Sequence, residues 1–445
     1  MPSRALPISG DSDPAVAELI AARPDLSMHA MDGLVLSGIP LNAVADALGT
    51  PTWVYSADAM RARFGALAAA LERAGVGAHI HYAVKANDHL AILRVFGEVG
   101  AGADVVSEGE LLRVRAAGLA PRRIVFSGVG KTARELRLAI TEDIAQVNVE
   151  SAEELEQVSG IAATLGRTVR VALRVNPDID AGTHAKISTG RAGDKFGIPA
   201  ADVTALYARA AGLPFVRPVG LAVHIGSQIA TMAPYRAAYA RVAELVRALR
   251  AAGHAVDTLD CGGGLGIGYR DEPLPGPAAL AGAIAGAFRD LDVGLIVEPG
   301  RWLIGPAGLL LAEVVLVKHA GARRFVVLDA AMNDLVRPSM YDAWHGIVPL
   351  GAAEAAGTAE PADIVGPICE SGDTFARNRA LPPLAPGARV AILDAGAYGA
   401  VMSSVYNARP LAAAAMIDAG RWAVIRDRQP VEALWREERI PDWLP

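Results

Sequence analysis

From about residue 79, short apolar runs rich in β-branched residues alternate with longer, alanine-rich stretches whose apolar positions recur at helical spacing. Short apolar runs predict buried strands, and a repeat of about 3.6 residues predicts amphipathic helices. The expected strands are residues 79–84, 103–106, 123–127, 146–149, 170–175, 220–225, 258–261 and 294–298. The expected helices include residues 108–117, 133–140, 152–165, 199–211, 233–252 and 278–291.

This alternation has two architectural interpretations. Eight strand–helix units in succession favour a closed (β/α)8 barrel of the TIM type, with a parallel sheet inside a ring of helices. The alternative is an open, doubly wound parallel sheet with helices on both faces. The number of units favours the barrel.

The alternation stops after Arg301, and strand-like stretches follow at 309–319, 324–328, 362–369, 389–393, 411–417 and 422–425. This pattern predicts a C-terminal antiparallel β-sandwich or β-barrel domain. Residues 351–361, rich in Gly, Pro and Ala, are expected to form an exposed loop. The expected organisation is an N-terminal extension (1–29), a partly extended segment joining the β domain (30–56), the barrel (57–305) and the β domain (306–445).

Composition narrows the class of partner. The 445 residues include 42 Lys+Arg and 48 Asp+Glu, for a net charge of −6. Because basic runs are missing from the sequence, neither nucleic acid nor an anionic membrane is expected as a partner. No apolar run is long enough to cross a membrane, and the N-terminus lacks a signal-peptide pattern. With only Cys261 and Cys369, a disulfide framework is excluded and a cytoplasmic location is expected.

Chemically versatile residues fall at the ends of the expected strands. In a β/α barrel the carboxyl ends of the strands form the active-site face, and phosphate often binds after the last two strands. These positions hold Lys85, Asp104, Arg174, Asn176, His224-Ile-Gly-Ser-Gln228, Cys261-Gly-Gly-Gly-Leu-Gly266 and Glu298-Pro-Gly-Arg301. The sequence therefore predicts one polar site at that face.

Lys85, Glu298 and His224 each have a functional and a structural interpretation. Desolvation lowers the pKa of a lysine and makes its amine a candidate Schiff-base nucleophile, whereas a salt bridge would explain Lys85 structurally. Glu298 could keep a heteroaromatic ring nitrogen protonated, or it could pair with Arg301. His224 could stack on a planar cofactor or fill a core position.

The glycine triplet 262–264 leaves backbone N–H groups free to approach an anion closely, and Arg301 favours a phosphate there. Taken alone, the triplet could be an ordinary turn. It is no dinucleotide fingerprint, because Ile267 stands at the third glycine position, and Gly130-Lys131-Thr132 is no P-loop, because Val125 replaces its first glycine. No metal site is expected, since zinc-binding His-Glu-x-x-His and Cys-x-x-Cys patterns are missing from the sequence.

A lysine, phosphate-binding glycines, a ring-nitrogen carboxylate and a stacking histidine together describe a pyridoxal 5′-phosphate site. Further motifs are Tyr82-Ala-Val-Lys85-Ala-Asn87, Cys369-Glu-Ser-Gly-Asp373 and Asp394-Ala-Gly-Ala-Tyr-Gly399. With all of these motifs, the chain from about residue 30 onward resembles the fold-type III pyridoxal-phosphate-dependent decarboxylases, and among them the diaminopimelate decarboxylases. The resemblance implies an alanine racemase-like barrel with a C-terminal β domain. Residues 183–197 resemble the active-site loop of this family.

The resemblance implies how the cofactor is held. Lys85 would form its Schiff base, Glu298 would pair with the pyridinium nitrogen and His224 would stack on the ring. Asp104 and Arg174 would support the site. The phosphate would be bound by Ser227, Gly262, Gly263, Gly264, Gly300, Arg301 and Tyr398.

The resemblance also implies how the substrate is held. Arg301, Arg337, Tyr341 and Tyr398 would bind its distal carboxylate and Glu370 its distal ammonium. Cys369 would protonate the carbanion, although a buried apolar cysteine is the alternative for this residue. The Cys369–Asp373 segment would enter the site of a neighbouring subunit, which implies a homodimer with shared active sites.

The implied activity is decarboxylation of meso-2,6-diaminopimelate to L-lysine and CO₂, the last step of bacterial lysine biosynthesis. Cationic and anionic groups for a second amino-acid head match that substrate. One alternative is a related decarboxylase acting on carboxynorspermidine, ornithine or arginine, which Arg337 and Glu370 argue against. An alanine-racemase-like enzyme fits the Cys369 motif less well. A catalytically inactive pyridoxal-phosphate-binding or regulatory homologue would be expected to have lost Lys85 or Cys369.

Overall fold

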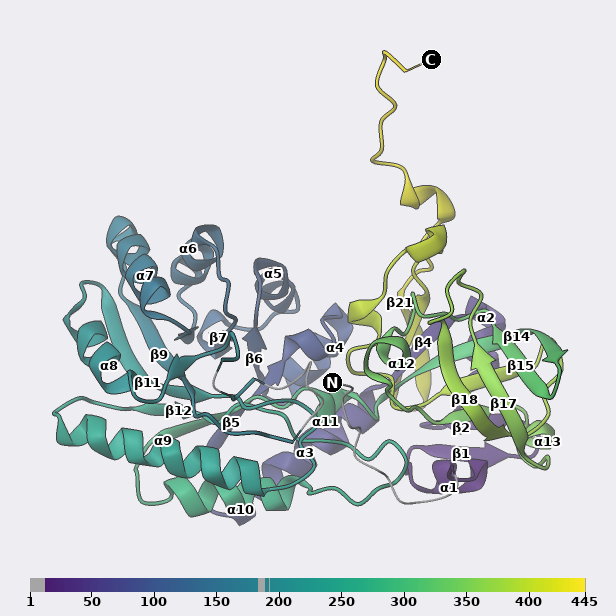
Figure 1. Cartoon of the computed structure of the whole chain (residues 1–445), viewed down its shortest axis with the longest axis horizontal. Helices are drawn as coiled ribbons and strands as arrows, with labels where there is room; N and C mark the ends of the chain where they lie inside the picture. Colours follow the sequence, from purple (N-terminus) through teal and green to yellow (C-terminus); the bar gives the residue numbers. More distant parts are fainter. Residues whose placement is uncertain (1–12, 183–188, 192, 445) are drawn as a thin grey trace. The chain divides into compact units, whose positions relative to one another are not determined.

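A computed structural model describes residues 13–182, 189–191 and 193–444, which leaves part of the predicted 183–197 loop outside the described residues. The chain forms two compact units (Figure 1). The first comprises Met60–Gly268 and Pro273–Ile304, and the second comprises residues 13–59, Tyr269–Glu272 and residues 305–444. No helix in the described part of the chain is long and apolar enough to span a membrane.

The first unit is a closed parallel barrel. Its described strands are β5 (Ala78–Ala83), β6 (Gly102–Val105), β7 (Ile124–Phe126), β8 (Gln146–Val149), β9 (Val169–Asn176), β11 (Val216–Val223), β12 (Thr258–Asp260) and β13 (Gly294–Val297). Each pairs in parallel with the next, and β13 pairs with β5, which closes the ring. The predicted fold class is confirmed, and the open-sheet alternative is wrong.

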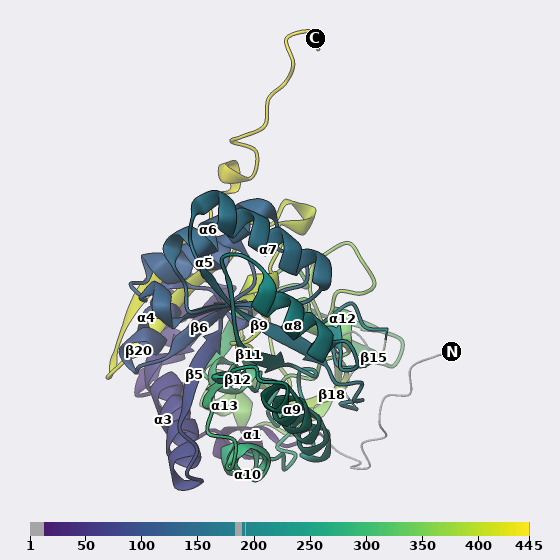
Figure 2. The same ribbon diagram turned by 90° about the vertical axis from the view of Figure 1, so that its left-hand side faces the viewer.

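Helices surround the strands of the barrel (Figure 2). They are α3 (Ala57–Arg73), α4 (Leu90–Glu98), α5 (Glu108–Ala116), α6 (Ala133–Glu142), α7 (Ala152–Leu165), α8 (Val203–Gly212), α9 (Ala233–Ala251), α10 (Pro277–Phe288) and α11 (Arg301–Ile304). The side chains of Ser107, Thr132 and Ser151 cap α5, α6 and α7 by accepting backbone N–H groups. Helix α8 begins later than expected because Ile198–Pro199 pairs with β9 as the short strand β10.

The second unit contains a small sheet of β1 (Leu26–His29), β2 (Gly33–Leu36) and β3 (Ile39–Pro40), and a nine-stranded sheet among its described residues. The larger sheet contains β4 (Thr52–Ser56), β14 (Gly308–Ala320), β15 (Arg323–Leu328), β16 (Ile347–Pro349), β17 (Glu360–Val365), β18 (Thr374–Leu381), β19 (Arg389–Ile392), β20 (Ala413–Asp418) and β21 (Arg421–Arg426). Most pairs are antiparallel, but β4–β20 and β15–β17 are parallel. Residues 52–56 belong to the larger sheet, because β4 pairs with β14 and β20.

The described residues of the second unit also form helices, which are α1 (Val16–Ala21), α2 (Leu41–Leu48), α12 (Arg337–Tyr341) and α13 (Ala352–Ala355). The buried core of this unit includes Leu41 and Val44 of α2, Val54 of β4 and Leu311 of β14. Apolar positions three residues apart bury one face of α2 against the strands.

Two expectations for this unit are wrong in detail. The strand predicted at 362–369 ends at Val365, because Gly366 and Pro367 follow and proline cannot donate to a β-ladder. Cys369 therefore lies on the connection between β17 and β18. The loop expected at 351–361 contains α13, and its last two residues already belong to β17.

Candidate active site

Lys85 and Asp104 meet at the carboxyl ends of two neighbouring barrel strands. Lys85 lies in a single helical turn, Val84–Ala86, that directly follows β5. Its Nζ is 2.8 Å from Oδ2 of Asp104 on β6. The Asp104 side chain is completely buried, and its Oδ1 has no hydrogen-bond partner among the described residues. The ion pair expected as the structural interpretation of Lys85 is thus present.

Glu298 directly follows β13 and is buried beside Asp260, the last residue of β12. Burial raises the pKa of Glu298 well above its usual range, and the negative charges of Asp104 and Asp260 raise it further. The carboxyl groups of Glu298 and Asp260 are hydrogen-bonded, which requires a proton between them, and Oε1 of Glu298 has no partner in the described structure. A buried acid with an unused oxygen is suited to binding a cationic N–H group of a ligand.

The glycine triplet lies where three strands end. A Cβ on Gly263 would be 2.0 Å from the carbonyl oxygen of Glu298, so only glycine fits this approach. The N–H of Gly263 donates to Nδ1 of His224 at 3.1 Å, which leaves the imidazole proton on Nε2. Burial, together with the positive charges of Lys85 and Arg174, lowers the pKa of His224 well below its usual value. The ring is therefore neutral and can present its face to a planar ligand.

Arg301 and Ser227 lie beside this triplet. Nη2 of Arg301, at the start of α11, donates to Oγ of Ser227 at 3.0 Å. Both residues carry donors that suit a phosphate or a carboxylate. Gly300 packs closely as well, since a Cβ there would be 3.0 Å from the Ala86 side chain.

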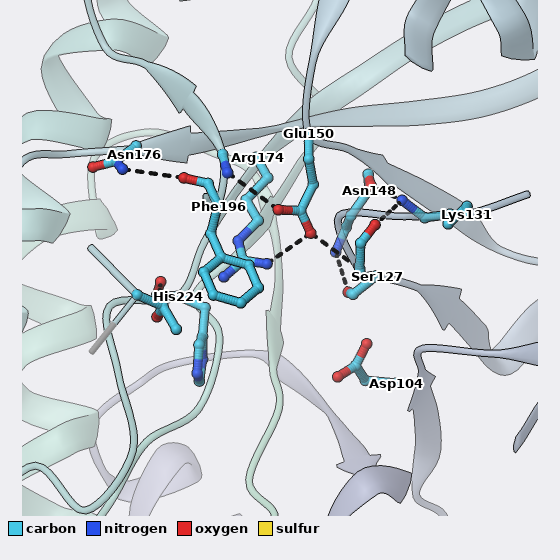
Figure 3. Close-up of polar contacts among 12 residues, drawn as sticks. Asp104, Ser127, Lys131, Asn148, Glu150, Arg174, Asn176, Phe196 and His224 are labelled. Carbon is cyan, nitrogen blue, oxygen red and sulfur yellow. Dashed lines mark hydrogen bonds and ion pairs between the residues drawn. The ribbon is translucent and has the colours of Figure 1, made fainter. Parts of the chain in front are cut away.

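Glu150, which the sequence reasoning missed, joins three loops at the strand ends (Figure 3). Its Oε1 accepts hydrogen bonds from Nη1 of Arg174 at 2.7 Å and from the N–H of Gly128 at 3.0 Å. Its Oε2 accepts one from the N–H of Gly197 at 3.1 Å. The guanidinium carbon of Arg174 lies 4.9 Å from the centre of the Phe196 ring. A carboxylate directly after the strand predicted at 146–149 was the available signal, since Asp104 and Glu298 stand at similar positions.

A second group that the sequence reasoning missed lies beside Glu150 (Figure 3). Nδ2 of Asn148 donates to Ser127 and to Asp260, at 3.1 Å in each case. The Lys131 ammonium donates to the carbonyl of Asn148 at 2.8 Å and pairs with Glu154 at 2.5 Å. Lys131 is therefore a structural link between loops, in agreement with the rejection of a P-loop.

The remaining expected residues lie in the second unit. Arg337 on α12 is buried, and its Nη2 donates to the Tyr269 hydroxyl at 3.1 Å. Tyr341 ends the same helix. Tyr398 lies in the turn after β19, with a left-handed φ of 55°.

Cys369 and Glu370 are exposed on the connection between β17 and β18. Buried Asp373 shapes this connection, because its carboxylate accepts the N–H groups of Ile368 and Met332, both at 2.7 Å. The alternative of a buried apolar cysteine is wrong for Cys369.

The barrel residues fit the expected pyridoxal phosphate. Two buried acceptors, Oδ1 of Asp104 and Oε1 of Glu298, lack partners among the described residues, and a primary amine lies next to one of them. The glycine triplet permits an anion to approach the backbone. No cluster of metal-ligating side chains is found in the described part of the chain.

Comparisons with known proteins give a consistent result. A family model described as the pyridoxal-binding domain of pyridoxal-dependent decarboxylases matches residues 58–305. A diaminopimelate decarboxylase of Zymomonas mobilis is 48% identical over 92% of this chain and 98% of that protein. A diaminopimelate decarboxylase of Pseudomonas aeruginosa is 44% identical over 92% of this chain and 97% of that protein. The crystal structure of the Helicobacter pylori enzyme complexed with L-lysine is 39% identical, with a TM-score of 0.86 over 89% of this chain and 99% of that chain. The crystal structure of the M. jannaschii enzyme is 33% identical, with a TM-score of 0.90 over 96% of this chain and 100% of that chain.

Proposed function

Because this chain belongs to the diaminopimelate decarboxylase family of pyridoxal-dependent decarboxylases, we propose that it converts meso-2,6-diaminopimelate to L-lysine and CO₂. The observation that carries this proposal is the match with diaminopimelate decarboxylases over about nine-tenths of the chain, with the family's lysine and buried carboxylate both present. The L-lysine in the H. pylori structure is the product expected of this reaction.

Bound pyridoxal phosphate supplies an electron sink for the pair left behind when CO₂ departs. In our proposal Lys85 would hold the cofactor through its side-chain amine, which lies beside the buried carboxylate of Asp104. Glu298 holds a proton at the ring nitrogen, and its raised pKa supports this role because a buried acid retains a shared proton. Neutral His224 would face the ring, and Asp104 and Arg174 would support the residues around it.

The phosphate would be bound at the glycine triplet and the loops beside it. The N–H of Gly264, the Ser227 hydroxyl and the backbone around Gly300 and Arg301 are the donors we propose from the barrel. Gly262 and Gly263, whose N–H groups already donate to Asp260 and His224, would instead give the phosphate room to approach the backbone. Tyr398 is proposed as a donor from the second unit.

Substrate specificity would come from groups that bind the second amino-acid head. We propose that Arg301, Arg337, Tyr341 and Tyr398 bind its carboxylate and that Glu370 binds its ammonium. The Cys369 thiol would then donate its proton to the α-carbon, forming a C–H bond where the C–CO₂ bond broke. Solvent would return a proton to the thiolate, because this residue is exposed.

We also propose a homodimer in which the exposed Cys369–Asp373 segment completes the site of the partner subunit. Mixing Lys85→Ala with Cys369→Ala tests this arrangement, because each variant should be inactive alone. Random exchange of subunits would give one intact site in half of the dimers, so activity should recover to about a quarter of the wild-type value. No recovery after verified subunit exchange would contradict a shared site.

The function itself is tested with purified protein and pyridoxal phosphate. The substrates meso-diaminopimelate, ornithine, lysine and arginine are offered separately, and CO₂ and the amine product are measured. L-lysine formed from meso-diaminopimelate alone supports the proposal, whereas CO₂ from another substrate would replace it with a related decarboxylase. Glu370→Ala should impair diaminopimelate turnover far more than cofactor binding, and Glu438→Ala, also exposed, is the matched control. Equal loss of both would refute the role of Glu370.

The cytoplasmic location and the boundaries of the four predicted segments stay predictions of the sequence.

A further inference from the structure

A cavity of about 300 Å³ lies within the second unit and has no role in the proposed reaction. Its walls come from α12 and the residues after it, from the start of β18, from the segment Tyr269–Glu272 and from residue 13. The charged and aromatic lining residues are Asp13, Arg270, Asp342, Trp344, Arg377 and Arg379. Three guanidinium groups thus face two carboxylates around one small space.

The wall formed by Arg379 already binds a carboxylate. The Arg379 side chain is only 6% exposed, and its Nε lies 3.0 Å from Oδ2 of Asp13. The indole Nε1 of Trp344 donates to Oδ1 of the same carboxylate at 3.0 Å. Two donors on rigid planar groups, one for each oxygen, are the arrangement that selects a carboxylate.

The positive charge of Arg270 and Arg379 is only partly balanced by Asp13. Nε of Arg270 is buried without a hydrogen-bond partner among the described residues, and its guanidinium carbon lies 5.3 Å from the centre of the Trp344 ring. Burial and the positive charge of Arg270 lower the pKa of Arg379 to about 10, against the effect of Asp13. A further anion in this cavity would offset the repulsion between the two arginines and satisfy the unpaired donor.

The cavity is connected to the proposed substrate residues through α12. Nη1 of Arg379 donates to the carbonyl of His345 at 2.8 Å, and Nε2 of that imidazole is 3.4 Å from Nε of Arg337. On another wall, the Ser339 hydroxyl of α12 donates to the carbonyl of Gly372 at 2.5 Å. Gly372 belongs to the connection that carries Cys369. A ligand in the cavity would therefore contact both elements that carry the proposed substrate groups.

We propose that this cavity is a binding site for a small carboxylate ligand, bound by Arg270 and Arg379, in which the Asp13 side chain is the intramolecular competitor. The proposal does not depend on the proposed function, because neither arginine is assigned to catalysis. It predicts that removal of Asp13 strengthens ligand binding.

Calorimetric titration of the full-length holoenzyme with succinate, at constant ionic strength, tests this proposal. An intramolecular carboxylate competes at a high effective concentration, so Asp13→Ala should tighten succinate binding by about tenfold. Adding Arg270→Gln to that variant should remove the gain, whereas adding Arg436→Gln, at an exposed arginine outside the cavity, should not. None of these changes removes a residue proposed to bind the substrate, so the differences between the variants report on the cavity.

Two results would overturn the proposal. Asp13→Ala could bind succinate no more tightly than the wild type, or its gain could survive Arg270→Gln. Sulfate serves as the second probe, and equally tight binding of sulfate would refute selection for a carboxylate. Because Arg270 is only partly buried, its variant should fold, and unchanged circular dichroism checks this.

Discussion

Glu150→Gln is the sharpest test of how the barrel site is held together. The Glu150 side chain is 1% exposed and that of Arg174 is 9% exposed, so the charges of both are removed from water. The carboxylate accepts hydrogen bonds from Arg174, Gly128 and Gly197. A glutamine amide has one acceptor oxygen, so at least one of these donors would face an NH₂ group.

The expected loss of stability in Glu150→Gln follows from two free-energy costs. Removing one partner of a buried ion pair costs about 3–5 kcal/mol, and leaving a buried donor unpaired costs about 1–3 kcal/mol. Because glutamine keeps one acceptor and the shape of glutamate, we expect Glu150→Gln to lower the free energy of unfolding of the barrel by about 3 kcal/mol. With a typical urea dependence, the unfolding midpoint should fall by roughly 1–3 M.

Glu156→Gln is the matched control, because Glu156 lies on α7 and pairs with Arg209 at 2.6 Å, against 2.7 Å for Glu150 and Arg174. The side chains of this control pair are 44% and 59% exposed, so water replaces the lost contact and no resolvable change is expected. Urea unfolding followed by circular dichroism compares the two variants. Hydrogen exchange should also accelerate at the amides of Gly128 and Gly197 in Glu150→Gln alone. Equal stability of the two variants would refute the reasoning from buried pairing.

Three further predictions concern the barrel. Lys85→Ala should abolish the long-wavelength absorbance band of the enzyme-bound cofactor, and a persisting band would mean that another lysine holds it. Burial raises the pKa of Glu110 from 4.5 to about 7. Its contribution to the free energy of unfolding is therefore complete below pH 4.5 and is lost as the pH rises through 7. The melting temperature of Glu110→Gln should depend less on pH across this range than that of the wild type, and an equal pH dependence would contradict this. Gly263→Ala places a Cβ 2.0 Å from the Glu298 carbonyl oxygen and should lower turnover by about a hundredfold, measured as CO₂ release, because the site residues must shift. Turnover near the wild-type value would show that the backbone adjusts without moving Glu298.

The sequence determined the barrel and the family, because the signals for both are local. Apolar periodicity depends on neighbouring residues, and the predicted strand at 146–149 and helix at 152–165 match β8 and α7. The motifs around Lys85 and Glu298 are contiguous, so they identified the pyridoxal-dependent decarboxylases before any contact was known. The expected strand at 362–369 failed because its proline ends the ladder.

Only the tertiary structure decided which side chains pair. Glu150 was an unremarked carboxylate in the sequence, and it became a junction because the loops after β7 and β9 bring Gly128 and Gly197 to the same two oxygens. Likewise, residue 13 lies hundreds of positions from Arg379, and no periodicity predicts their contact. Pairing of buried charges depends on desolvation and on distances in three dimensions, and a linear pattern contains neither.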